Sequence, residues 1–346
     1  MYRVIMVPTD GTGFDREAIR VALRIAERTE AKVKLVRVLG TGSFFAVAVA
    51  AEGTAVATAV VRSERDRALG ELYALAAECR ALSNVEIGVD LHAGPVTDVL
   101  EDYARRHEVD LIVISTHGRS GIARMSLGSV TDSLIRHTSI PVLVVKPPTS
   151  YLNPQAGKAF THIVVPLDGS SLAEQIIAPI VSLASLEGAE ITLLHVIRAQ
   201  PPAPTEITTS GPAWWEKDIK SAQSYLQRVS RQLRRRAGVR VDTDIVVSQS
   251  VPGAISDFAA REKIDLIAIA THGRGGLARM LRGSVADAVL HQANTSMLVL
   301  RPDNALASEA TVENNDVLFG SWRSVELLPV LSQRAAAVLN SPTGNQ

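Results

Sequence analysis

Two stretches of this sequence resemble each other so closely that the chain must contain a duplicated unit. "THGRSGIARMSLGS" occupies residues 116–129, and "THGRGGLARMLRGS" occupies residues 271–284. Extending the comparison from residue 110 and from residue 265 gives a gap-free alignment of 38 residues, of which 19 are identical. Any fold for this chain therefore has to accommodate the same unit twice.

Each unit alternates short apolar runs with segments of helical periodicity. In the first unit, strands are predicted at 2–8, 32–39, 85–94, 110–115 and 141–147, and helices at 15–29, 63–82, 96–107 and 130–138. The second unit restarts with the same layout at 161–184 and 191–197. This alternation predicts an α/β fold with one parallel sheet per unit, helices on both faces and right-handed crossovers.

The repeat boundaries divide the chain. We expect a first domain at 1–147, a linker at 148–160 that contains Pro, Gly and Asn, and a second domain at 161–302. Residues 303–346 match neither unit and are predicted to form a C-terminal tail.

Composition narrows the function classes. The 36 basic and 36 acidic residues balance, so charge gives no argument for nucleic acid or an anionic membrane as a partner. The single cysteine, Cys79, excludes an intramolecular disulfide framework and a cysteine-based zinc cluster. We expect a cytoplasmic protein whose partners are small molecules or proteins.

Three local features have two readings each. The apolar stretch 44–61 approaches the length of a membrane span, but Glu52 and Gly53 interrupt it, which favours a helix packed on the protein or at a subunit contact. The basic run 231–240 lies on a predicted long helix and is typical of a solvated face rather than of nucleic-acid binding. Trp214 and Trp215, in a proline-rich insertion, either cover the second crevice or pack on their own domain.

The duplicated loop has the composition of a phosphate site. It runs from a strand through a glycine and nine further residues to Gly-Ser at the start of a helix, where unpaired amides and the helix dipole favour an anion. Positive charge could come from Arg119, Arg124, Arg274 and Arg279. The alternative is that Ser129 and Ser284 only cap their helices, because both begin an S-x-x-D pattern close to a capping box.

A second element is predicted to converge on each loop. Asp10 and Asp168 follow the first strand of each unit, at the carboxyl edge where ligands bind in open α/β sheets. A carboxylate there can accept a hydrogen bond from the amino group of adenine. The alternative is that each aspartate caps the next helix.

These motifs together resemble the universal stress protein family. The resemblance rests on "VPTDG" and "VPLDG" after the first strands, "LLHVI" as a second strand, and "DLIVISTHG" followed by G-x9-G-S before "PVLVVKP". It covers roughly 1–147 and 160–302. It implies two tandem Rossmann-like domains of the adenine-nucleotide α-hydrolase type, each with a five-stranded parallel sheet, and ATP binding through a G-x2-G-x9-G-[ST] pattern.

The resemblance also assigns residues to the ligand. Asp10 or Asp168 would meet adenine, flanked by backbone groups of Val38 or Val196. The remaining predicted contacts are Ser115, His117, Gly118, Arg119, Gly128 and Ser129 in the first unit and Ala270, His272, Gly273, Arg274, Gly283 and Ser284 in the second. A Mg²⁺ ion accompanying ATP would be held mainly by the phosphates.

The sequence departs from the family pattern at three places. Ser115 and Ala270 stand where the pattern has its first glycine. The turn "HAGPV" at 92–96 has no aligned counterpart in the second unit, where Pro252-Gly253 is displaced. Arg37 in the first unit aligns with His195 in the second, a difference that the sequence leaves uninterpreted.

Three function classes follow. The first is an ATP-binding regulator in a stress response. The second is a slow ATP hydrolase or adenylyl-transfer enzyme using His117 and His272, for which no base–nucleophile spacing is recognisable. The third is a nucleotide-free scaffold whose last strands pair across domains or subunits, giving an internal pseudo-dimer or a homo-oligomer. The motifs of protein-bound zinc and calcium sites are missing.

Overall fold

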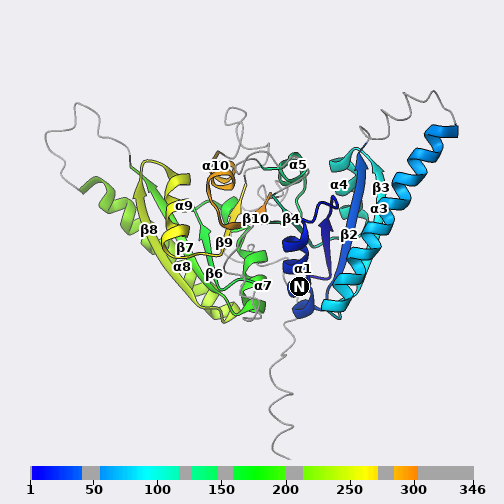
Figure 1. The fold of residues 1–346 in the computed structure, drawn as a ribbon. Coiled ribbons are helices and arrows are strands. Elements are labelled where there is room, and N and C mark those ends of the chain that lie inside the picture. Colours follow the sequence, from blue (N-terminus) through cyan, green and yellow to red (C-terminus); the bar gives the residue numbers. More distant parts are fainter. Residues whose placement is uncertain are drawn as a thin grey trace, which may run out of the picture.

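The computed structural model describes residues 2–40, 55–116, 127–146, 159–199, 213–271 and 284–302. These residues form one ten-stranded sheet covered by helices on both faces (Figure 1). The strands are β1 Val4–Pro8, β2 Lys32–Gly40, β3 Ile87–Gly94, β4 Leu111–Ser115, β5 Val142–Val145, β6 His162–Pro166, β7 Glu190–Arg198, β8 Val241–Ser248, β9 Leu266–Ala270 and β10 Ser296–Leu300. The helices are α1 Arg16–Thr29, α3 Ala55–Leu82, α4 Val96–Arg106, α5 Ser129–His137, α6 Ser171–Glu174, α7 Ile177–Glu187, α8 Ala213–Ala237, α9 Val251–Arg261 and α10 Ser284–Gln292.

The sheet order confirms the predicted α/β class and the duplication. The strands run β3-β2-β1-β4-β5-β10-β9-β6-β7-β8, and all pairings within each half are parallel. The single antiparallel pairing joins β5 to β10, with Leu143 opposite Leu298. The last strands of the two repeats therefore pair within the chain, which makes one continuous sheet out of two five-stranded units.

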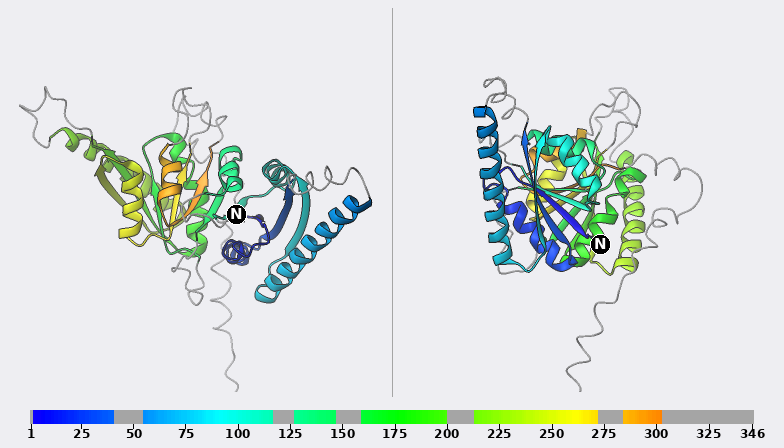
Figure 2. Two further views of the ribbon diagram at one scale, coloured as in Figure 1. Left: turned by 45° about the horizontal axis from the view of Figure 1, so that its top comes forward. Right: turned by 90° about the vertical axis from the view of Figure 1, so that its right-hand side faces the viewer.

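The sheet has a core on each face because its strands are apolar on both sides. Ile5 and Val7 of β1 face one cluster, shared with α1, α3, α7 and α8, and Met6 faces the other, shared with α4, α5, α9 and α10. Both clusters run across the β5–β10 junction, so the helices of the two repeats cover the same two faces (Figure 2).

Equivalent cations tie the two repeats together at the end of each last strand. Lys146, after β5, donates to the carbonyl oxygens of Leu290 and Ala293 at the C-terminal end of α10. Arg301, after β10, donates to the carbonyl oxygen of His137 at the end of α5, over 2.8 Å. Burial lowers the pKa of Lys146 to about 8. Each repeat thus supplies the cation that satisfies the last helix of the other.

Several helix and linker boundaries in the structure differ from the predicted ones. Helix α3 begins at Ala55, eight residues before the expected start, so the end of the apolar stretch 44–61 belongs to this helix; residues 44–54 lie outside the described residues. Trp214 and Trp215 fall in the first turn of α8 and not in an insertion. Most of the expected linker and the whole tail after Pro302 also lie outside the described residues, but Phe160 is a core residue.

The other ambiguous segments resolve in part. Within the described ranges, the helices lack the combination of length and hydropathy that a membrane span requires. The basic run is divided between the end of α8 and the approach to β8. There Arg234 donates to the carbonyl oxygen of Val241, and Arg240 pairs with Glu190.

Candidate functional site

Three predicted site residues of the first repeat lie at one level of the sheet edge. Pro8 of β1 is paired with Val36 of β2, and Met6 is paired with Ile112 of β4. Counting forward along these parallel strands brings Asp10, Val38 and Ser115 to the same carboxyl edge. The chain order reverses between β1 and β4, so this is the topological switch point where open α/β sheets bind ligands.

Asp10 shapes the turn after β1 and leaves one oxygen available. Its Oδ1 accepts hydrogen bonds from the amide of Thr12 at 2.9 Å and from the hydroxyl of Thr12 at 2.6 Å. Its Oδ2 accepts none of the hydrogen bonds found among the described residues. The N-cap of α1 is Asp15, so the capping alternative for Asp10 is wrong.

The N-terminus of α5 lies at the end of β4, and no described side chain caps its first amides. The N-cap residue is Gly128, which provides no side chain, and Ser129 is the first helical residue. Asp132 does not complete a capping box, because it pairs with Arg136 at 2.7 Å. Thr131 anchors the helix by donating to the carbonyl oxygen of Ser115 at 3.4 Å. The capping alternative for Ser129 is therefore wrong.

The second repeat places its residues at the same positions and forms the same turn, but there the turn also caps the next helix. Asp168, Val196 and Ala270 lie at the ends of β6, β7 and β9. Oδ1 of Asp168 accepts from the amide and hydroxyl of Ser170, and the Ser170 hydroxyl in turn caps α6 by accepting from the amide of Ala173 at 3.1 Å. The cap in this repeat is therefore Ser170 and not Asp168.

The remaining predicted contacts cannot be placed. His117, Gly118, Arg119, His272, Gly273, Arg274 and Gly283 lie outside the described residues. Ser284 begins α10 as expected, and its side chain is outside the description.

Sequence reasoning missed an ion pair beneath the first turn, in which the arginine is buried and the glutamate is 42% exposed. Only 4% of the Arg37 side chain is exposed, and its Nη1 lies 2.7 Å from Oε2 of Glu71 on α3. The hydrogen bond from Arg37 holds the pKa of the Glu71 carboxyl below its ordinary value. The available signal was a charged residue inside the apolar run "LVRVL" at 35–39.

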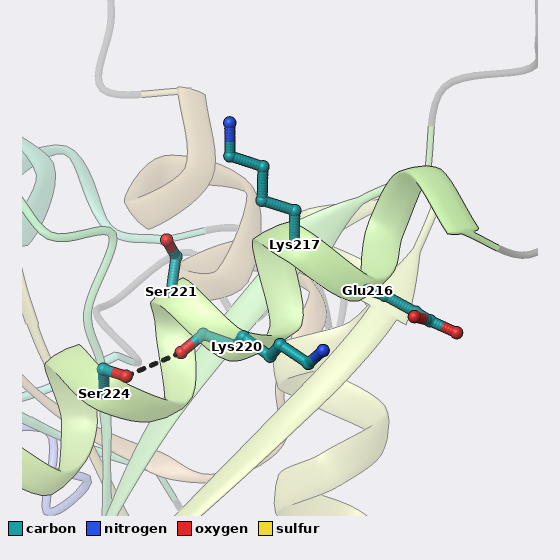
Figure 3. Close-up of a pocket in the computed structure, with 5 residues that line it drawn as sticks. All are labelled: Glu216, Lys217, Lys220, Ser221 and Ser224. Carbon is teal, nitrogen blue, oxygen red and sulfur yellow. Dashed lines mark hydrogen bonds between the residues drawn. The ribbon is translucent and has the colours of Figure 1, made fainter.

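A separate hollow of about 540 Å³ lies along α8, lined by Glu216, Lys217, Lys220, Ser221 and Ser224 (Figure 3). One helix supplies all five side chains and all five are exposed, so no second element among the described residues converges there. The predicted site residues that the structure describes do not line it. In the part of the chain that is described, no cluster of three or more His, Cys, Asp or Glu residues has the arrangement of a metal site.

The sequence model of the universal stress protein family matches residues 1–146 and 159–301. The chain belongs to the universal stress protein family. These two matched segments are the two halves of the sheet, each with its own switch point and turn aspartate.

Comparison with individual relatives supports the same family assignment. Universal stress protein MJ0531 of Methanocaldococcus jannaschii is 32% identical over 149 residues, which cover 43% of this chain and 84% of that protein. A universal stress protein of Mycolicibacterium smegmatis is 24% identical over 304 residues, covering 86% of this chain and 97% of that protein. The crystal structure of a universal stress protein from Archaeoglobus fulgidus superimposes with a TM-score of 0.62 at 15% identity, over 86% of this chain and 98% of that one. The tandem arrangement thus recurs in the family.

The cap assignments predict that one of two serine substitutions destabilises the protein and that the other does not. Ser250 caps α9 by accepting from the amide of Gly253 at 3.2 Å, so Ser250→Ala should lower the free energy of unfolding by about 1 kcal/mol. Ser129→Ala removes no cap and should change it by less than about 0.5 kcal/mol. Urea denaturation followed by circular dichroism measures both. Equal losses in the two variants would contradict the assignment of Gly128 as the cap.

Proposed function

We propose that this protein is a cytoplasmic adenine-nucleotide-binding regulator, with ATP as its ligand, that transmits nucleotide status in a stress response. The nucleotide would lie across the carboxyl edge of the sheet, with adenine at the turn after the first strand and the phosphates at the N-terminus of the last helix. Magnesium, when present, would be held by the phosphates.

The observation that carries the proposal is the N-terminus of α5, where none of the described side chains caps the first amides. Gly128 provides no capping side chain, and the hydrogen bond from Thr131 to Ser115 holds this helix end beside the end of β4. An anion is the ligand such a helix end favours. Asp10 lies at the neighbouring strand end, and its Oδ2, which accepts no hydrogen bond from the described residues, would supply an acceptor for the other end of a nucleotide.

The family supports the ligand class. One of its members was solved in complex with cAMP, and another, from Archaeoglobus fulgidus, in complex with dAMP. Both ligands are adenylates, so AMP and cAMP belong in the test beside ATP.

The first experiment is mass spectrometry of small molecules released by denaturing freshly purified full-length protein. We expect ATP or ADP near one or two equivalents per chain. A protein that carries no adenylate and also fails to bind added Mg-ATP, AMP or cAMP would refute the proposal.

Gly128→Val tests the phosphate end. A Cβ at Gly128 would lie 3.7 Å from the carbonyl oxygen of Thr116, which is ordinary van der Waals contact, so the substitution should leave the fold intact. The added side chain would occupy the space in front of the helix amides and weaken ATP binding at this site at least tenfold, about 1.4 kcal/mol. Isothermal titration calorimetry measures the change.

The matched control is Gly70→Val, which adds the same side chain on α3, where a Cβ meets nothing within 4 Å among the described residues. Its ATP affinity should equal that of the unmodified protein. A folded Gly128→Val variant with unchanged affinity at the first site would place the phosphates elsewhere.

A further inference from the structure

The two repeats build the turn that carries their aspartate on different supports. In the first repeat, a Cβ on Gly11 would lie 2.7 Å from Nη1 of Arg37, so the guanidinium is packed directly beneath the turn. Gly11 also has φ +76, a conformation that side chains rarely adopt. The turn is thus tied through Arg37 to Glu71 on α3, and Asp10 is half-buried upon it.

In the second repeat this support is replaced. His195 stands in place of Arg37, and Tyr225 of α8 stands in place of Glu71, with ring centroids 6.4 Å apart. Burial and the nearby Glu174 carboxylate raise the pKa of Tyr225, so it remains neutral. No described atom lies within 4 Å of a Cβ built on Gly169, and Asp168 is exposed. On the side of the second turn to which a Gly169 side chain would point, no described residue therefore takes the place that the Arg37 guanidinium has in the first.

The N-termini of the helices also differ between the repeats, because side-chain caps are found in the second repeat. In the first repeat, α1, α4 and α5 all begin without a side-chain cap, and Gly94, with φ +145, leads into Pro95 at the start of α4. In the second repeat, Ser170 caps α6 and Ser250 caps α9. Serine side chains thus satisfy first-turn amides of α6 and α9 in the second repeat, where α7 has no side-chain cap, whereas none of the three helices α1, α4 and α5 described in the first repeat has one.

From these differences, and resting on the proposed function, we propose that the chain binds adenine nucleotide tightly in the first repeat only, and that Arg37 with Glu71 is the positioning pair that holds Asp10 for the base.

Preorganisation is the physical reason. A ligand that must order a turn loses part of its binding free energy in doing so, whereas a turn that is already fixed gives the full hydrogen bond. Arg37 suits this role because its planar guanidinium fills the space under Gly11 while its charge is satisfied by Glu71. The pair touches no predicted ligand position itself, so its effect is expected on the base that Asp10 selects.

Stoichiometry is the first test. Equilibrium dialysis of the full chain with radiolabelled ATP and Mg²⁺ should give one tight equivalent. Asp10→Ala should weaken it at least about tenfold, the effect of losing a hydrogen bond to a charged group. The matched variant Asp168→Ala should leave it unchanged.

The second test replaces Arg37 and Glu71 by their counterparts from the second repeat. Arg37→His with Glu71→Tyr gives the first repeat the residues that the second repeat already accommodates, so folding is expected and is checked by thermal melting. Adenine offers an amino group to Asp10 where guanine has a carbonyl oxygen, so the unmodified protein should prefer ATP over GTP. The exchange should weaken ATP binding about tenfold and reduce the ATP-to-GTP preference by a similar factor. The mirror variant, His195→Arg with Tyr225→Glu, should leave both values at the first site unchanged.

The outcomes separate this inference from the proposed function. Two equal equivalents, each abolished by its own aspartate variant, would overturn the inference and leave the proposed function standing. A single equivalent lost in Asp168→Ala would do the same. A folded exchange variant that keeps the ATP-to-GTP preference would remove the positioning role from Arg37 and Glu71. A chain that binds no adenylate would overturn the proposed function itself.

Discussion

Replacing Leu298 with alanine should lower the free energy of unfolding by about 3 kcal/mol. Leu298 lies on β10 directly opposite Leu143 of β5, at the antiparallel pairing that joins the two halves of the sheet. Both side chains are fully buried in the core cluster that runs across the junction. Truncation there leaves a cavity between two packed layers, and the surrounding strands have little freedom to close it.

Guanidinium denaturation monitored by circular dichroism measures this loss. The control is Leu82→Ala, the same substitution at a residue that is 80% exposed at the end of α3, where we expect a change within about 0.5 kcal/mol. Similar losses in the two variants would mean that the β5–β10 junction contributes no more than an exposed surface.

The fold was predictable because the repeat and the strand periodicity constrain it together. Apolar runs such as "RVIMVP" and "HIVVP" are short and β-branched, and both became central strands. The parallel sheet with helices on both faces followed from the alternation and from the family resemblance, whereas the strand order came from the structure. The antiparallel junction was open to two interpretations, because a sequence cannot distinguish pairing within a chain from pairing between subunits.

Helix boundaries were less predictable where tertiary packing overrides local composition. The first turns of α3 continue an apolar stretch that looked like a separate insertion. In the second repeat the helix after β6 is divided into α6 and α7, whereas α1 is continuous. The Ser170 cap and its hydrogen bond to Asp168 stabilise the short first turn, and the sequence D-G-S-S alone did not reveal that division.

The sequence predicted which residues line the candidate site, but not the side-chain contacts that hold them in place. Asp10, Val38, Ser115 and Gly128 were named from the sequence, and the structure brings them to one sheet edge. The serine in S-x-x-D resembled a cap, and only the geometry showed that Asp132 pairs with Arg136 instead. Arg37 and Glu71 are 34 residues apart and belong to no motif, so their pairing required the packing of α3 on β2.

The second large effect is expected at Asp265. This residue is 5% exposed, and its carboxylate accepts from the amide of Thr161 at 2.7 Å, from the hydroxyl of Thr161 at 2.8 Å and from the amide of His162 at 3.1 Å. Burial raises its pKa, and these three hydrogen bonds oppose the rise. Asp265→Ala would remove the buried acceptor of three part-buried hydrogen bonds at the start of β6 and should lower the free energy of unfolding by about 3 kcal/mol.

Asp110 occupies the equivalent position in the first repeat and provides the comparison. It accepts from the amides of Arg3 and Val4, but 28% of its side chain is exposed, so water can replace it. We expect Asp110→Ala to lower the free energy of unfolding by about 1 kcal/mol. Hydrogen exchange at the amides of Val4 and His162 would locate both effects. The two carboxylates differ chiefly in their access to water. A larger loss in Asp110→Ala than in Asp265→Ala would therefore mean that burial does not determine how strongly these aspartate hydrogen bonds stabilise the fold.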